Sequence, residues 1–215
     1  MKIGGLNKFS LSDFPGKVAA VVFTQGCNFR CPFCHNKSLL PLDVEDDLLI
    51  TEDEFFAFLD SRSDLLDAVV ISGGEPTIQP DLFAFLHRIR AMGFAVKLDT
   101  NGSKPEVLKE IIENRLVDHI AMDIKAPLHI YKRLAGKVSS CEGVPESIAL
   151  ISKSGIDHEF RTTVVEALLT PVDMREIRKL IPIRSTYRLQ KFCPEHALDP
   201  ALRKTTNMYL GDPLL

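Results

Sequence analysis

The sequence predicts an α/β fold built on a parallel sheet, and two observations support this prediction. Short runs of apolar, often β-branched residues alternate with segments of helical periodicity along almost the whole chain, which is typical of βαβ units. Polar and glycine-rich motifs follow the apolar runs rather than precede them, as in folds whose active site lies at the carboxyl ends of the strands. Periodicity alone does not distinguish an incomplete barrel from a doubly wound open sheet.

Six of the apolar runs are expected to be strands, because each is short and most are too apolar to leave one face in water. Six such units are too few to close an eight-stranded barrel. In chain order, the predicted strands are residues 17–24, 67–72, 94–99, 118–124, 158–165 and 186–192.

The segments between these strands carry apolar residues at helical spacing, and several helix ends are marked in the sequence. Thr51 and Glu54 form a predicted capping box, and Gly93 and Gly155 stand where helices should end. Prolines lie near the expected helix starts at Pro80, Pro105, Pro145 and Pro171. The helical apolar positions are Phe55, Phe56, Phe58, Leu59, Leu82, Phe83, Leu86, Ile89, Met92, Val107, Leu108, Ile111 and Ile112.

Composition and charge limit the domain organisation and the classes of partner. The 215 residues contain no low-complexity run, no Ser/Gly-rich linker and no shift in composition, so one domain spanning residues 1–215 is expected. With 26 basic and 29 acidic residues, bulk charge indicates neither a nucleic acid nor a membrane surface as partner. The N-terminus lacks a signal-peptide apolar region and no apolar stretch could span a bilayer, so we expect a cytoplasmic protein.

Three of the five cysteines fall within the segment "TQGCNFRCPFCHN", at the spacing C-x3-C-x2-C. A structural zinc site needs a fourth ligand, and the nearby candidate, His35, directly follows Cys34, so the two side chains can seldom reach one metal. Three thiolates instead suit a 4Fe–4S cluster, whose fourth iron stays open for a ligand. Unreactive buried cysteines are the remaining alternative, but packing gives no reason for such residues to cluster in a polar loop. Cys27, Cys31 and Cys34 are therefore the candidate cluster ligands.

A second motif, "SGGEPT", follows the second predicted strand. Gly73 and Gly74 would let the backbone approach a ligand closely, and Glu75 adds a carboxylate. Alone, the motif could equally be a strand-to-helix turn, because two glycines are a weak signal.

Together, the two motifs resemble the radical S-adenosylmethionine (SAM) superfamily. Further segments, "FSLSDFPGKVAAVVFTQGCNFRCPFCHN", "VVISGGEPTIQP", "VKLDTNGSKPEVL", "HIAMDIKAP" and "FRTTVV", look like the activating enzymes of glycyl-radical proteins. They are most similar to the short-chain activating proteins of anaerobic ribonucleoside-triphosphate reductase. The resemblance covers residues 3 to about 192. It implies an incomplete (β/α)6 barrel of parallel strands, a TIM-like radical SAM core.

The resemblance also implies roles for individual residues. Cys27, Cys31 and Cys34 would hold the 4Fe–4S cluster, Phe33 would pack near the adenine of SAM, and Gly73, Gly74 and Glu75 would bind its methionine amino group. Asp99, Thr100 and Asp123 match a monovalent-cation site beside the SAM carboxylate, and Lys125 belongs to the same "DIK" motif. Asp123 and Lys125 could instead form a simple ion pair, because side chains two apart on a strand share a face.

His196 matches a histidine that some activating enzymes place near SAM. Here the sequence departs from the pattern, because Cys193 and Pro194 stand where short-chain relatives tend to carry Arg-Pro. The roles of His196 and Cys193 therefore stay open at this point. For Cys193 and Cys141 we expect the behaviour of small apolar side chains.

The implied activity is reductive cleavage of SAM to methionine and a 5′-deoxyadenosyl radical, which removes a Cα hydrogen from a glycine of a larger partner. The partner would be a glycyl-radical enzyme, most similar to an anaerobic ribonucleotide reductase, and the electron donor a flavodoxin or ferredoxin-type protein. Three alternatives share some of these motifs: activation of a pyruvate formate-lyase-like enzyme, radical SAM chemistry on a small molecule, and a non-catalytic zinc or iron–sulfur module.

Overall fold

The computed structural model describes residues 1–136 and 141–205, and its centre is one sheet of seven strands in the order β1 to β7. Strands β2 to β7 pair in parallel, whereas β1 pairs antiparallel with β2. The six predicted strands and the incomplete parallel barrel are confirmed. The bounds are β1 (Ile3–Ser10), β2 (Ala19–Thr24), β3 (Ala68–Gly73), β4 (Ala95–Thr100), β5 (His119–Asp123), β6 (Asp157–Val164) and β7 (Thr186–Lys191).

Strand β1 is an addition that the sequence did not predict. Its sequence, "IGGLNKFS", carries two glycines and several polar residues, and so shows neither an apolar run nor alternation. Pairing with β2 fixes it, Ile3 lying opposite Thr24 and also bridging to Ile50. This segment therefore forms a strand because it pairs with β2, and its own sequence does not predict the strand.

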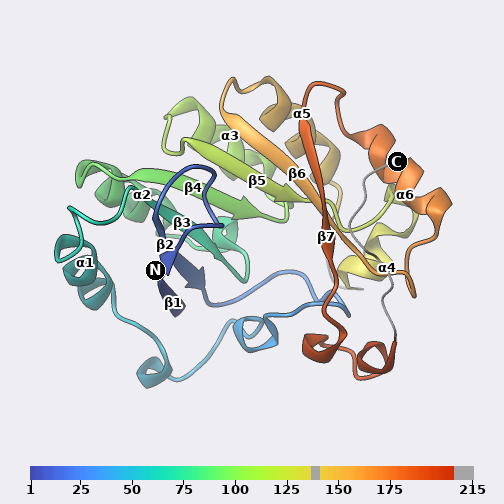
Figure 1. Ribbon diagram of the computed structural model, residues 1–215, viewed down its shortest axis with the longest axis horizontal. Coiled ribbons are helices and arrows are strands. Elements are labelled where there is room, and N and C mark those ends of the chain that lie inside the picture. Colours follow the sequence, from blue (N-terminus) through green and yellow to red (C-terminus); the bar gives the residue numbers. More distant parts are fainter. Residues whose placement is uncertain (137–140, 206–215) are drawn as a thin grey trace.

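Helices cover the outer side of the curved sheet, as Figure 1 shows. The predicted capping box is present, because Thr51 and Glu54 bond to each other's backbone amides. Gly93 and Gly155 adopt positive φ angles of 89° and 72° just after helices, the conformation that glycine favours there. The bounds are α1 (Glu52–Asp60), α2 (Leu82–Ala91), α3 (Pro105–Glu113), α4 (Tyr131–Ala135), α5 (Val144–Lys153) and α6 (Pro171–Leu180).

The two faces of the sheet are filled differently. Apolar helix side chains such as Phe55, Leu86 and Ile111 are fully buried against the outer face. On the inner face, Phe14 from the loop between β1 and β2 packs on small side chains that include Ala19 and Ala68. Polar side chains of the inner face lie toward the carboxyl ends of the strands. Among the described residues, no helix combines the length and apolarity needed to cross a membrane.

Candidate active site

A cavity of about 290 Å³ lies where the loops after the strands meet, at the carboxyl end of the sheet. In Figure 1 the loop after β2 runs across this end toward the turns that follow β7. All predicted site residues except His196 line the cavity: Cys27, Cys31, Phe33, Cys34, Gly73, Gly74, Glu75, Asp99, Thr100, Asp123 and Lys125. The structure therefore brings together motifs that are up to about a hundred residues apart in the chain.

The cysteine loop, residues 25–36, is held in place by several parts of the chain. The Arg30 backbone N–H donates to the Ala135 carbonyl at 2.7 Å, which ties the loop to the end of α4. The Asn28 amide donates to Ser103 at 2.8 Å and accepts from the Asn101 side chain at 2.9 Å, which ties it to the loop after β4. These bonds fix the backbone on which the three thiols stand.

Burial makes the three thiols hard to ionise in the absence of a metal. It raises the pKa of Cys27 to about 12, helped by the nearby Glu75 carboxylate. It raises the pKa of Cys31 to about 11, although Lys125 opposes this shift, and it also raises the pKa of Cys34. At neutral pH the thiols are therefore protonated, and iron binding would release their protons.

The donor set fits a 4Fe–4S cluster better than a zinc ion. The three cysteines are unpaired by disulfides, come from one loop and face one cavity. Within residues 1–136 and 141–205, no three His, Cys, Asp or Glu side chains are grouped as ligands of a single metal ion. A cubane instead takes each thiolate on a different iron, so its ligands stand farther apart.

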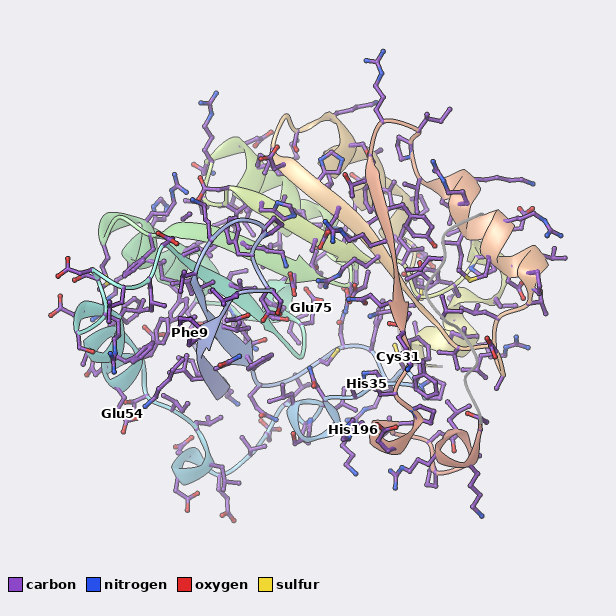
Figure 2. All side chains as sticks on the ribbon, viewed as in Figure 1. Phe9, Cys31, His35, Glu54, Glu75 and His196 are labelled. Carbon is purple, nitrogen blue, oxygen red and sulfur yellow. The ribbon has the colours of Figure 1, made fainter. Side chains whose placement is uncertain are left out.

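His35, the candidate fourth zinc ligand, is engaged elsewhere. Its Nε2 accepts a hydrogen bond from the Cys193 backbone N–H at 3.3 Å, and its ring stacks on Phe192 with 5.6 Å between centroids. Figure 2 shows His35 near Cys31 and His196. His196 lies in the short turn Pro194–His196, packs edge-on against His35 at 6.4 Å and does not line the cavity. His35, rather than His196, is thus the histidine at the cavity wall.

Gly73 and Gly74 allow a close approach, and the structure shows what they approach. Gly73 has a φ of 114°, and a Cβ there would lie 2.2 Å from the Thr24 backbone nitrogen. A Cβ on Gly74 would lie 2.0 Å from the Gly26 carbonyl oxygen. The glycines therefore let the strip pack directly on the start of the cysteine loop, where Glu75 N–H also donates to the Gly26 oxygen at 2.9 Å.

The Glu75 side chain is almost completely buried and accepts four hydrogen bonds from protein groups. Its Oε1 accepts from the Thr77 N–H at 3.1 Å, the Thr77 hydroxyl at 2.5 Å and the Thr100 hydroxyl at 2.7 Å. Its Oε2 accepts from the Asn101 N–H at 2.7 Å. Burial nevertheless raises the pKa of this carboxyl. Glu75 thus links the loops after β3 and β4 while it lines the cavity.

Asp123 and Lys125 form the ion pair considered above, with 3.0 Å between Lys125 Nζ and Asp123 Oδ2. Burial opposes charging both groups, but the surrounding opposite charges prevail. Arg161 and Lys125 hold the pKa of Asp123 well below its usual range, and Asp123 raises the pKa of Lys125. Because both side chains also line the cavity, the pair belongs to the site.

The structure adds two charged residues that motif reasoning did not single out, Asp13 and Arg161, both at the cavity wall. Arg161 stands on β6 opposite Asp123 in the parallel register. The signal in the sequence was a single charged residue, Arg161, among the uncharged residues of the segment "FRTTVV". Cys141 lies outside the cavity in the apolar core, where a small buried side chain was expected.

A family model described as the radical SAM superfamily matches residues 21–181, which is most of the chain. The chain belongs to the radical SAM superfamily. As a radical SAM enzyme it uses a 4Fe–4S cluster and SAM, and the three cavity cysteines fit the cluster. It is 36% identical over 207 residues to a Methanocaldococcus jannaschii protein provisionally named a glycyl-radical enzyme activating enzyme, covering 94% of this chain and 84% of that one.

Two further comparisons agree with this membership. The radical SAM chain is 29% identical over 197 residues to the pyruvate formate-lyase-activating enzyme of Clostridium pasteurianum, covering 87% of this chain and 77% of that one. Its fold resembles the crystal structure of QueE from Escherichia coli, with a TM-score of 0.57 and 17% identity over 88% of this chain and 83% of that one. The last likeness concerns the fold alone.

Proposed function

We propose that this radical SAM enzyme generates a glycyl radical on a partner protein, an anaerobic ribonucleoside-triphosphate reductase. The observation that carries the activase function is the 36% identity to the archaeal activating-enzyme relative over 94% of the chain. The choice of partner rests on the resemblance of the five sequence segments to the short-chain activating proteins.

The residues of the cavity suit this chemistry. Cys27, Cys31 and Cys34 would hold the cluster, and the strip Gly73 to Glu75 would bind the amino acid end of SAM. The bound cluster would supply one-electron reduction of SAM, with the electron coming from a flavodoxin or ferredoxin-type donor, and this would give methionine and a 5′-deoxyadenosyl radical. That radical takes one hydrogen atom from a glycine Cα of the partner, which yields 5′-deoxyadenosine and the glycyl radical.

The open side of the barrel favours a protein loop as the substrate. Strands β1 and β7 are the two edges of the sheet, and the cavity is lined near them by Asp13 and Gln190. β7 is largely exposed along its length. A flexible loop that leaves its own fold to enter here must be ordered on binding, so we expect modest, transient affinity.

The test is to mix reduced protein, SAM and the candidate reductase under anaerobic conditions, and to measure the glycyl radical by electron paramagnetic resonance (EPR) together with 5′-deoxyadenosine. We expect a doublet radical signal on the reductase, absent when Cys31→Ala replaces the wild type. A radical formed only on a pyruvate formate-lyase-like protein would change the partner. Deoxyadenosine without a radical on either protein would contradict the activase function and favour a small-molecule substrate.

A further inference from the structure

Asp99 and Asp123 stand at the ends of neighbouring strands, β4 and β5, and protein cations occupy every carboxylate oxygen of the two residues. Lys97 Nζ lies 2.7 Å from Asp99 Oδ1, and Lys125 Nζ lies 3.0 Å from Asp123 Oδ2. Arg161 joins the two carboxylates, with Nη1 at 3.3 Å from Asp99 Oδ2 and Nε at 2.8 Å from Asp123 Oδ1. The guanidinium of Arg161 therefore lies between the two acids.

In this arrangement each carboxylate oxygen of Asp99 and Asp123 already has a cationic partner, and Asp99 Oδ2 also accepts from the Ser72 hydroxyl at 3.1 Å, so a metal cation there would be repelled by three protein cations. A hard cation needs several oxygen ligands at once, and the sequence offered Asp99, Thr100 and Asp123 for that purpose. The Thr100 hydroxyl instead donates to Glu75 at 2.7 Å and accepts from the Gly102 N–H at 3.1 Å. The residues present do not fit a monovalent-cation site.

The charges in this cluster do not cancel. Lys97, Lys125 and Arg161 supply three positive charges against the two negative charges of Asp99 and Asp123. Arg161 is 12% exposed and Asp99 14% exposed, so solvent screens the cluster little. The neighbouring Glu159 lies 4.0 Å from Arg161 but pairs more closely with Arg188, at 2.8 Å. The five residues of this cluster therefore carry one net positive charge, and two of its cations, Lys125 and Arg161, line the cavity together with the carboxylates of Asp13 and Glu75.

We propose that Arg161 takes the place of a monovalent cation, bridging Asp99 and Asp123 and offering positive charge to the carboxylate of SAM. SAM binding by this enzyme is then independent of potassium and sodium. This inference concerns SAM binding alone and goes beyond the proposed function, because it does not depend on which partner receives the radical.

The experiment titrates SAM into anaerobic protein carrying a reduced cluster and follows the change in the cluster's EPR signal. The titration is run in potassium, sodium and tetramethylammonium chloride at equal ionic strength. For the wild type we expect half-saturation concentrations that agree within about twofold, since the cation is built into the chain. A wild type that binds SAM about tenfold more tightly in potassium or sodium than in tetramethylammonium would overturn the proposal.

Variants of Arg161 separate this role from a merely structural one. Arg161→Ala removes the bridging charge, so SAM binding in tetramethylammonium should weaken by roughly ten- to a hundredfold, and potassium should restore part of it. The matched control is Arg184→Ala, which replaces an exposed arginine in the turn before β7 that does not line the cavity; this variant should bind SAM as the wild type does. Arg161→Ala that loads its cluster and binds SAM normally in tetramethylammonium would also overturn the proposal. If that variant does not fold, the wild-type comparison still decides.

Discussion

Glu75 is a buried carboxyl that lines the cavity and also holds two loops together. The four donors around it come from two loops, and two of them are backbone N–H groups that no other acceptor replaces. An ordinary surface carboxylate would contribute little to stability, whereas one that satisfies several buried donors contributes much more. Glu75 is therefore expected to affect SAM binding in two ways, by holding the strip Gly73 to Glu75 in place and by contacting SAM directly.

Replacing Glu75 by alanine should lower both stability and SAM affinity. The change leaves four donors without their acceptor, so we expect the free energy of unfolding to fall by roughly 2 to 4 kcal/mol. Guanidinium unfolding of the metal-free protein measures this, and Glu45→Ala, at an exposed position, is the control expected to change little. Wild-type stability combined with weakened SAM binding would instead show that Glu75 acts only as a ligand.

The sequence predicts those residues of the candidate site that belong to a short motif. The spacing of Cys27, Cys31 and Cys34 is a property of eight consecutive residues, and the three side chains line one cavity. The bridge that Arg161 makes could not be predicted in this way. It depends on the register that sets Asp123 opposite Arg161 across β5 and β6, and no short motif in either strand reveals this register.

At the scale of elements, the strip after β3 and the loop after β2 form one packed unit. The positions of Gly73 and Gly74 in the sequence indicated a close approach, but not its partner, which is the cysteine-loop backbone. The strands likewise differ in how far their own sequences predict them. β2 to β7 were predicted from their own sequences, while β1 forms because it pairs with the edge of β2. Local sequence pattern therefore predicts β2 to β7 and misses β1, which depends on pairing with β2.

Gly74→Ala should show that close packing at this position, and not merely the loss of a glycine, determines the change in stability. The new Cβ would meet the Gly26 and Leu39 backbone, which cannot yield without moving the cysteine loop. We expect a loss of roughly 3 kcal/mol in unfolding free energy and a lower iron content after reconstitution. Gly16→Ala is the control, since its φ is 72° but nothing lies within 4 Å of a Cβ there, and its cost should stay near 1 kcal/mol. Equal effects of the two changes would contradict this account.

For the whole molecule, the cysteine loop contacts segments that lie far apart along the described part of the chain. Besides its contacts near β3 and β4, it is bonded to α4 through Arg30, and the Pro32 carbonyl accepts from the Asp199 N–H at 2.8 Å. The charged bridge of Asp99, Asp123 and Arg161 similarly joins three successive strands beneath it. The groups that line the cavity therefore also stabilise the open barrel. Conditions that neutralise their charges should lower the stability of the whole fold.

Protonation of Asp123 at low pH should lower the free energy of unfolding. Its folded-state pKa is held below the ordinary value near 3.8, because Arg161 and Lys125 outweigh the effect of burial. A carboxyl with a depressed pKa contributes stability that is fully present above the unfolded pKa and is lost as the pH falls toward the folded one. At pH 7, Asp123→Asn should thus lower the unfolding free energy by about 3 to 5 kcal/mol, the cost of breaking a buried ion pair.

The gap between wild type and Asp123→Asn should stay constant from pH 7 down to about pH 4 and narrow below it, because only the wild type then gains a proton on this group. Guanidinium unfolding of the metal-free proteins at a series of pH values measures the gap. Asp60→Asn, at an exposed position at the end of α1, should match the wild type within about 0.5 kcal/mol at pH 7. A gap between wild type and Asp123→Asn that stays constant below pH 4, or is absent at pH 7, would show that the Asp123 charge is not what the bridge uses.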